Sequence, residues 1–199
     1  MNKEILVLYY SRYGATKQMA MLIARGIESV PGISARIRTA PLVSAVCEKV
    51  ADDIPDSGHP YVENTDLAEC VGLALGSPVR FGNMAAHMKY FWDNTSAEWL
   101  SGTLIGKPAC VFTSSSSLHG GQEACLMSMM IPLLHHGMLI VGLPYSNQEL
   151  LTTKTGGTPY GVSHLAGINS NFDLSDEESS LAFAQGKHLA QIALKLGRE

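Results

Sequence analysis

Short β-prone apolar runs alternate with helical patterns along the whole chain, and this alternation limits the fold more than any other feature. Residues 5–10 are apolar throughout, as expected of a strand that is covered on both faces. Residues 17–29 follow with apolar side chains three and four positions apart, which predicts an amphipathic helix. Strands separated by helices predict an α/β fold, in which a parallel sheet carries helices on both faces. The other expected strands are 34–39, 71–75, 109–113 and 138–143.

Three further helices are expected downstream of the first. Residues 85–95 carry apolar side chains at helical spacing, and residues 121–136 do the same, although Pro132 should kink or cut the helix there. Ser175 is expected to cap a long final helix whose acidic start suits the helix dipole.

Two segments lack a regular pattern. Residues 41–66 are interpreted as a loop with a short helix, because polar residues and prolines replace the apolar periodicity. Residues 145–172 are rich in glycine, proline and serine and are interpreted as an inserted loop region. With no internal repeat and no linker, the chain is expected to form a single domain over residues 1–199.

The composition excludes several classes of protein. Hydrophobic residues make up 46% of the chain and charged residues 16%, which is typical of a globular protein and not of a disordered one. A net charge of -4 supplies no phosphate-neutralising surface, so we expect no nucleic-acid partner. Histidines and a glycine interrupt the most apolar stretch, so we expect no membrane insertion. The four cysteines form no CxxC pair or metal-ligand cluster, which favours a reduced, cytoplasmic protein without a metal.

The strand pattern also predicts where a ligand binds. Five strands in a doubly wound sheet favour the flavodoxin-like order 2-1-3-4-5, whose ligands lie outside the carboxyl ends of the strands. The loops after the first, third and fourth strands are therefore expected to meet at one edge of the sheet.

The loop after the first strand has the chemistry of a phosphate site. Residues 11–16 carry two hydroxyls and a glycine immediately before a helix, where backbone N–H groups and the helix dipole favour a negative charge. The Walker and GxGxxG patterns are absent. An ordinary helix start capped by Ser11 or Thr16 remains the alternative.

The other two loops offer groups that suit a planar ring. Residues 77–83 present a cation, a flat apolar face and an amide in Arg80, Phe81 and Asn83. Residues 114–122 are a run of hydroxyls and glycines that can bind the polar edges of a ring system. A structural turn and a flexible serine loop are the alternatives when each is taken alone. Together the three loops favour a mononucleotide site.

Four motifs resemble the WrbA family. They are YYSRYG from Tyr9, GSPVRFGNM from Gly76, HHGM from His135 and GGTPYG from Gly156. WrbA proteins are flavodoxin-like NAD(P)H:quinone oxidoreductases that were first named as tryptophan-repressor-binding proteins. The resemblance covers nearly the whole chain and is weakest within 41–66, and the RFGN and GGTPYG motifs are highly specific to the family.

The resemblance implies an FMN site on the three loops. The first loop would hold the FMN phosphate, the second would lie along the isoalloxazine ring, and the third would line its other edge. His136 would reach the flavin from a neighbouring subunit, while Trp99 and Tyr13 would frame the pocket for the nicotinamide or quinone. The cofactor-binding residues implied are Ser11, Arg12, Tyr13, Gly14, Ala15, Thr16, Pro78, Val79, Arg80, Phe81, Ser114, Ser115, Ser116, Ser117, Leu118, His119, Gly120, Gly121 and His136.

The third loop departs from the family pattern. The family usually has STGTGGG there, whereas this chain has SSSSLHGG, which is one residue longer and lacks two of the glycines. We expect this loop to remain a flavin contact, and we expect the change to affect ring affinity and substrate access.

The function implied by the resemblance is the two-electron reduction of quinones to hydroquinones. NADH or NADPH would reduce the bound FMN, and a quinone would then take the electrons at the same face, in a ping-pong mechanism without a covalent protein catalyst. The family also implies a homotetramer. Neither the physiological quinone nor the choice between NADH and NADPH follows from the sequence.

An electron carrier and a regulatory protein are the alternatives to this function. A flavodoxin-type electron carrier is disfavoured by the modest negative charge, the 145–172 insertion and the methionine-rich helix before His135. The sequence does not support a role as regulatory partner of a DNA-bound repressor, because no basic patch or groove-binding helix is evident.

Overall fold

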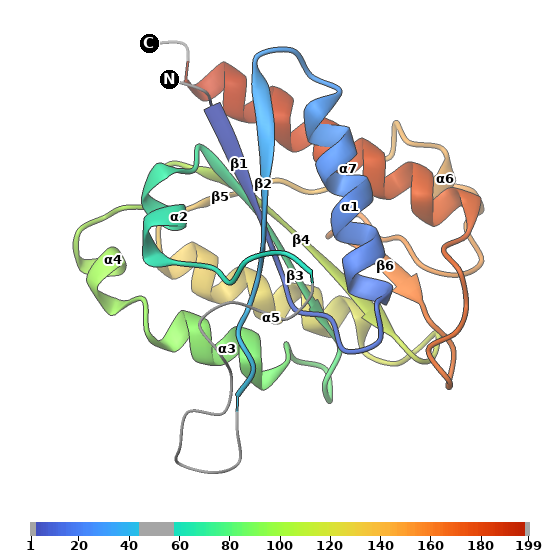
Figure 1. The fold of residues 1–199 in the computed structure, drawn as a ribbon. Helices are drawn as coiled ribbons and strands as arrows, with labels where there is room; N and C mark the ends of the chain where they lie inside the picture. Colours follow the sequence, from blue (N-terminus) through green and yellow to red (C-terminus); the bar gives the residue numbers. More distant parts are fainter. Residues whose placement is uncertain (1–2, 44–57, 198–199) are drawn as a thin grey trace.

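The strands form one parallel sheet in the computed structural model, which describes residues 3–43 and 58–197 (Figure 1). Its order is β2-β1-β3-β4-β5, which confirms the predicted flavodoxin-like arrangement, and a sixth strand, β6, also pairs with β4. The strand bounds are β1 Lys3–Tyr9, β2 Ile33–Thr39, β3 Gly72–Pro78, β4 Pro108–Ser115, β5 Leu139–Ile140 and β6 Val162–Leu165.

The sixth strand corrects the prediction of five. β5 is only two residues long, not the six expected, and pairs with the first residues of β4. β6 lies within residues 145–172, for which the sequence predicts an inserted loop, and it pairs with the last four residues of β4. Buried backbone groups need partners, so the second half of β4 takes a new strand where β5 ends. This strand of four residues follows directly after a glycine- and proline-rich turn, and so short a pattern does not predict a strand.

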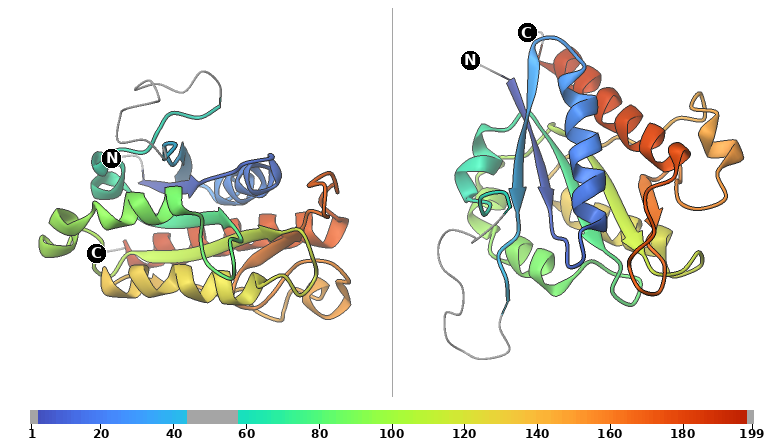
Figure 2. Two further views of the ribbon diagram at one scale, coloured as in Figure 1. Left: turned by 90° about the horizontal axis from the view of Figure 1, so that it is seen from below. Right: turned by 45° about the vertical axis from the view of Figure 1, so that its right-hand side comes forward.

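Seven helices surround the sheet in the described part of the chain. α1 and α7 lie side by side on one face, and α3 and α5 cover the other (Figures 1 and 2). Their bounds are α1 Ala15–Glu28, α2 Asn64–Glu69, α3 Ala86–Asp93, α4 Ser96–Leu100, α5 Gln122–His135, α6 Glu149–Thr152 and α7 Asp176–Leu196.

Three helical expectations need correction or completion. The helix predicted at 85–95 ends at Asp93, and α4 begins separately after Thr95. Pro132 does not cut α5, which continues to His135. The proline can donate no backbone hydrogen bond, but its own carbonyl still accepts from the His136 N–H at 3.0 Å. Of the segment 41–66, residues 44–57 lie outside the described residues, and the rest includes the start of α2.

Both faces of the sheet are buried, as the continuous apolar runs predicted. In β1, Ile5 and Val7 pack on the side of α1 and α7, while Leu6 and Leu8 pack on the side of α3 and α5. α1 and α7 approach closely because Gly26 faces the Phe183 carbonyl and Gly186 faces the Ile23 carbonyl, where a Cβ would overlap backbone atoms. No helix in the described part of the chain is long and apolar enough to cross a membrane.

Candidate active site

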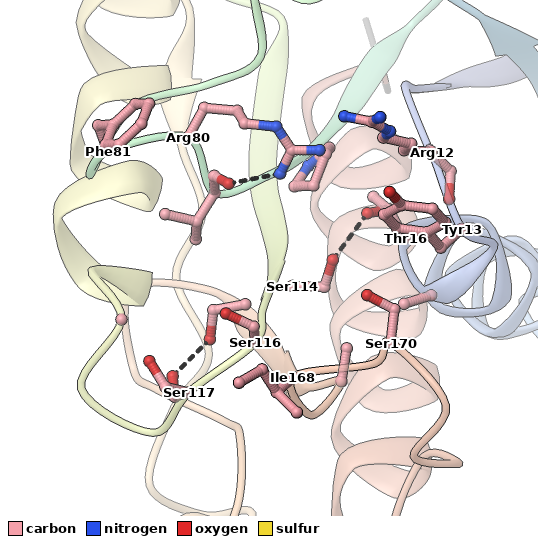
Figure 3. A pocket seen from close by; sticks show the side chains of 17 residues that line it. Arg12, Tyr13, Thr16, Arg80, Phe81, Ser114, Ser116, Ser117, Ile168 and Ser170 are labelled. Atoms are coloured by element: carbon pink, nitrogen blue, oxygen red, sulfur yellow. Dashed lines mark hydrogen bonds between the residues drawn. The ribbon is translucent and has the colours of Figure 1, made fainter.

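The loops at the carboxyl ends of β1, β3 and β4 meet around one cavity, as predicted (Figure 3). Its volume is about 430 Å³, within the range of small-molecule sites. A fourth segment, the connection from β6 to α7, closes one side of it. The lining residues are Ser11, Arg12, Tyr13, Ala15, Thr16, Pro78, Val79, Arg80, Phe81, Ser114, Ser115, Ser116, Ser117, Gly120, Ala166, Ile168 and Ser170.

The sequence pattern does not predict the fourth segment. Ala166, Ile168 and Ser170 follow β6, and the Ala166 N–H donates to the Ser115 carbonyl at 2.8 Å, so the segment continues the edge of the sheet. Recognising residues 162–165 as a strand would have placed these residues at the same edge as the other three loops.

The start of α1 leaves backbone donors free at the cavity. Its N-cap is Gly14, with a φ of 96° that favours glycine, and no side chain of the described residues caps the helix. The Ser11 hydroxyl accepts from the Gly14 N–H, at 3.1 Å. Within the described residues, the N–H groups of Ala15, Thr16 and Lys17 have no hydrogen-bond acceptor. An ordinary capped helix start is therefore not what this loop forms, and the free N–H groups fit a phosphate.

Two buried hydroxyls join the first and third loops beside these amides. Thr16 Oγ1 and Ser114 Oγ lie 2.9 Å apart, and either can donate (Figure 3). Such a pair can turn its protons toward an anionic oxygen at little structural cost. The structure thus brings the hydroxyls of two predicted loops to the start of α1.

The second loop forms a tight turn at the opposite side of the cavity. The Arg80 and Asn83 backbones exchange hydrogen bonds of 2.8 and 3.0 Å, and Phe81 in the turn has a φ of 52°. The Phe81 side chain is fully exposed and offers a flat apolar face at the rim. The Val79 N–H donates to the Ser114 carbonyl at 2.8 Å, which fixes this loop to the third.

The third loop is ordered by its own hydroxyls. Ser115 Oγ donates to the Ser117 carbonyl at 2.8 Å and accepts from Gln122 Nε2 at 2.8 Å. Leu118 and His119, the residues that depart from the family pattern, are exposed and do not line the cavity. Gly121 does not line it either and serves as the N-cap of α5, with a φ of 88°.

Trp99 and His136 lie in a different place from the other predicted residues. Both line a second cavity, of about 340 Å³, between α3, α4 and the end of α5. α5 starts at the first cavity and ends before His136, and a helix of 14 residues spans roughly 20 Å. One chain therefore does not bring His136 and Trp99 to the three loops.

His136 is held as a buried imidazole in that second cavity. Its Nε2 lies 3.0 Å from Thr95 Oγ1, and its ring meets the edge of Trp92 at 5.2 Å. Burial lowers its pKa, against the opposing effect of Glu98. Trp99 Nε1 donates to the His135 carbonyl at 3.0 Å, which ties α4 to the end of α5.

The first cavity contains groups that bind and orient, but no evident acid or base. Among its described lining residues, none is aspartate, glutamate, histidine or cysteine. Over the described ranges, no group of three or more histidine, cysteine or acidic residues could hold a metal ion. Hydroxyls, backbone amides and two arginines suit a bound cofactor that itself carries the reactive atoms.

Comparisons with known proteins agree with this geometry. Residues 5–149 match the model of the NADPH-dependent FMN reductase family. The chain is 42% identical to an NAD(P)H dehydrogenase (quinone) of Chromohalobacter salexigens, covering 97% of this chain and 98% of that protein. Another NAD(P)H dehydrogenase (quinone), from Trichlorobacter lovleyi, is also 42% identical with the same coverage.

Solved structures show the same fold. A flavodoxin, described as WrbA-like, from Agrobacterium tumefaciens superposes with a TM-score of 0.69 at 22% identity, over 97% of this chain and 98% of that one. Flavodoxin 1 of Bacillus cereus gives 0.62 at 18% identity, over 95% and 98%. The fold and the site thus define a flavodoxin-like flavoprotein. The chain belongs to the NADPH-dependent FMN reductase family, and the WrbA resemblance drawn from its motifs is confirmed.

Proposed function

We propose that this protein is an FMN-dependent NAD(P)H:quinone oxidoreductase that reduces quinones to hydroquinones by two electrons. The observation that carries the proposal is the cavity at the carboxyl edge of the sheet, where an uncapped helix start and three loops offer donors for a phosphate and a ring. Relatives of 42% identity over nearly the full chain carry the name of this activity.

Different residues of the cavity would bind different parts of FMN. The free amides of Ala15, Thr16 and Lys17, with the Thr16 and Ser114 hydroxyls, would hold the phosphate. The turn around Arg80 and the serine loop would border the ring from two sides. The other first-loop residues, and Leu118 to Gly121 beyond the serines, are proposed to support these contacts.

The chemistry of electron transfer belongs to the cofactor. Bound FMN would supply the redox chemistry, by taking up a hydride from NADH or NADPH and then reducing a quinone with two electrons, while the quinone takes up two protons to give the hydroquinone. The chain's own contribution is to orient the reactants: the rim residues Tyr13 and Phe81 are exposed and offer flat surfaces against which an aromatic substrate can stack.

Steady-state kinetics test this proposal directly. Because both substrates would use the same face in turn, rates measured against NADH at several benzoquinone concentrations should give parallel double-reciprocal lines. Intersecting lines would contradict the ping-pong mechanism. If neither NADH nor NADPH supports FMN-dependent turnover, the proposed function is wrong.

We further propose a homotetramer in which Trp99 and His136 approach the cofactor of a neighbouring subunit. Their separation from the three loops within one chain supports this, and so do exposed apolar side chains on and around α5, including Met127, Ile131 and Leu134. Light scattering coupled to size exclusion should give four times the chain mass of 21.4 kDa. A monomer that turns over quinone at full rate would contradict the assembly.

A cytoplasmic location is proposed from the thiols. The described cysteines Cys70, Cys110 and Cys125 are free and buried. Burial raises the pKa of Cys110 to about 12 and that of Cys125 to about 11, so neither is a reactive thiolate at neutral pH. Fractionation of cells that express the tagged protein would test this.

A further inference from the structure

A separate cavity lies beside the cofactor cavity and shares two arginines with it. Its volume is about 450 Å³, and Arg12 and Arg80 line both spaces. The remaining walls come from the end of β1 and the start of α3, through Tyr10, Ala85, Ala86 and His87.

The cavity around Arg12 and Arg80 has a positive charge. Among its described lining residues none is acidic, whereas two are guanidinium groups, in a chain whose net charge is -4. Burial and the charges of Arg80 and Arg12 lower the pKa of His87, so the fields of both arginines converge at that ring. The positive end of the α3 dipole also points here, because the helix begins at Ala86.

The side chains are held in place before any ligand binds. Arg80 Nη1 donates to the Val79 carbonyl at 2.8 Å, and the Arg12 guanidinium lies 5.1 Å from the centre of the Tyr13 ring. The His87 ring stacks on Tyr10 with centroids 4.0 Å apart and planes 9° from parallel. Within the described residues, buried His87 Nδ1 has no hydrogen-bond partner. The two guanidinium groups are thus held in place beside the ring, and preorganised cations of this kind favour binding of an anion.

The FMN phosphate has a different set of donors. The free amides of α1 and the Thr16–Ser114 pair lie at the helix start. Figure 3 shows the Arg12 and Arg80 guanidinium groups on the far side of that pair from Ser116 and Ser117, pointing toward each other at the edge of the cavity. With the phosphate of FMN held by those donors, the two arginines would be free to face a second anion beside His87.

We propose that Arg12, Arg80 and His87 bind a phosphate group of the nicotinamide co-substrate. This inference rests on the proposed function, which supplies NADH or NADPH as the anion beside the flavin. The phosphate is either the diphosphate that both nucleotides carry or the 2′-phosphate of NADPH, because guanidinium pairs recognise both groups.

The test is calorimetric binding of two nucleotides that lack a nicotinamide to the FMN-loaded protein. Adenosine 5′-diphosphate carries the diphosphate, and adenosine 2′,5′-bisphosphate carries the 2′-phosphate. His87→Glu places a negative charge in the cavity around Arg12 and Arg80, and His87 does not line the cofactor cavity. We expect this variant to weaken nucleotide binding by about tenfold or more. The nucleotide that loses more affinity identifies the phosphate that is recognised.

The matched control is His188→Glu, which makes the same change on α7, at a half-buried histidine on the other face of the sheet. It should leave both affinities within about twofold. Arg12→Gln provides a second test in case His87→Glu perturbs the fold, and its FMN affinity is measured separately because Arg12 also lines the cofactor cavity.

Three results would overturn the proposal. One is nucleotide affinity that stays within about twofold of wild type in both variants. Another is a loss of FMN affinity in His87→Glu without a loss of nucleotide affinity, which would assign the cavity to the cofactor. The third is no measurable nucleotide binding by the wild-type holoprotein. Because binding is measured without turnover, a protein that binds these nucleotides but does not oxidise NADH or NADPH would refute the proposed function and leave this site standing.

Discussion

The two helices that pack side by side on one face of the sheet, α1 and α7, begin in opposite ways. At α7, Ser175 and Glu178 form a capping box, with the Glu178 N–H donating to Ser175 Oγ at 3.1 Å. At α1, Gly14 provides no cap, and the first amides remain without acceptors among the described residues. A helix that serves only the fold satisfies its own end, whereas the helix at the cavity leaves its end to a ligand.

One buried carboxylate, that of Glu178, accepts several hydrogen bonds at the start of α7. Glu178 accepts from the N–H groups of Gly156, Leu165 and Ser175 at 2.8 to 3.0 Å. It also accepts from His164 Nδ1 at 2.7 Å. This group joins α7 to β6 and to the preceding turn, and so fixes the segment that closes the cofactor cavity.

The largest effect is expected for Glu178→Gln. The amide group would turn a donor toward N–H groups that now find an acceptor, so unfolding free energy should fall by about 3 kcal/mol. Urea unfolding of the FMN-free protein measures it. Glu177→Gln is the control on the same turn and should change stability by about 0.5 kcal/mol or less. If both variants lower the free energy of unfolding equally, the buried hydrogen bonds of Glu178 have no special role in stability.

The complementary test at α1 is Thr16→Val. Removal of the hydroxyl should weaken FMN binding by about tenfold, because a charge-assisted hydrogen bond to the phosphate is lost. Flavin fluorescence titration gives the affinity. Thr158→Val removes an equally buried hydroxyl, bonded to the Gly161 carbonyl at 2.9 Å away from the cavity, and should leave FMN affinity within about twofold. Similar losses in both variants would argue against a phosphate at α1.

A smaller effect is expected for Ser175→Ala, which removes the cap of α7. The free energy of unfolding should fall by about 1 kcal/mol, with FMN affinity unchanged. Ser179→Ala, one turn further along the same helix, serves as the control in the same urea experiment. A change in FMN affinity without a change in stability would show that the cap of α7 also serves the ligand.

The stability difference between wild type and Glu178→Gln should depend on pH. Burial alone would raise the pKa of Glu178, but the hydrogen bonds from His164, Leu165 and Ser175 outweigh it, and the pKa lies below its usual value of 4.5. A lowered pKa gives stability that is present above 4.5 and lost as the pH falls below it. Unfolding measured at pH 7 and near pH 3 should show the difference shrink, and a difference that grows in acid would contradict the contacts described.

The sheet order and the position of the site could be predicted because they follow from local patterns. Continuous apolar runs such as 5–10 specify buried parallel strands, and the loops after them must meet at the carboxyl edge. The boundary of β5, the strand β6 and the split at Thr95 could not be predicted, since tertiary pairing and packing decide them over a few residues.

The buried pair of Glu178 and His164 illustrates a second limit. In the sequence, the acidic start of the last helix needs only the helix dipole to explain it, and His164 is one of several scattered histidines. Their contact joins residues that only the pairing of β6 with β4 brings together. The proposal that Trp99 and His136 approach the cofactor of a neighbouring subunit involves a second chain, so it stays a prediction.

An anaerobic titration of the FMN-loaded protein tests the central claim most directly. NADH is added while the visible absorbance of the flavin is followed, and benzoquinone is then added in equal amount. The account predicts complete bleaching by NADH and full recovery of the absorbance with quinone. A flavin that stays oxidised with both NADH and NADPH, yet is bleached by dithionite, would contradict the enzyme and favour an electron carrier.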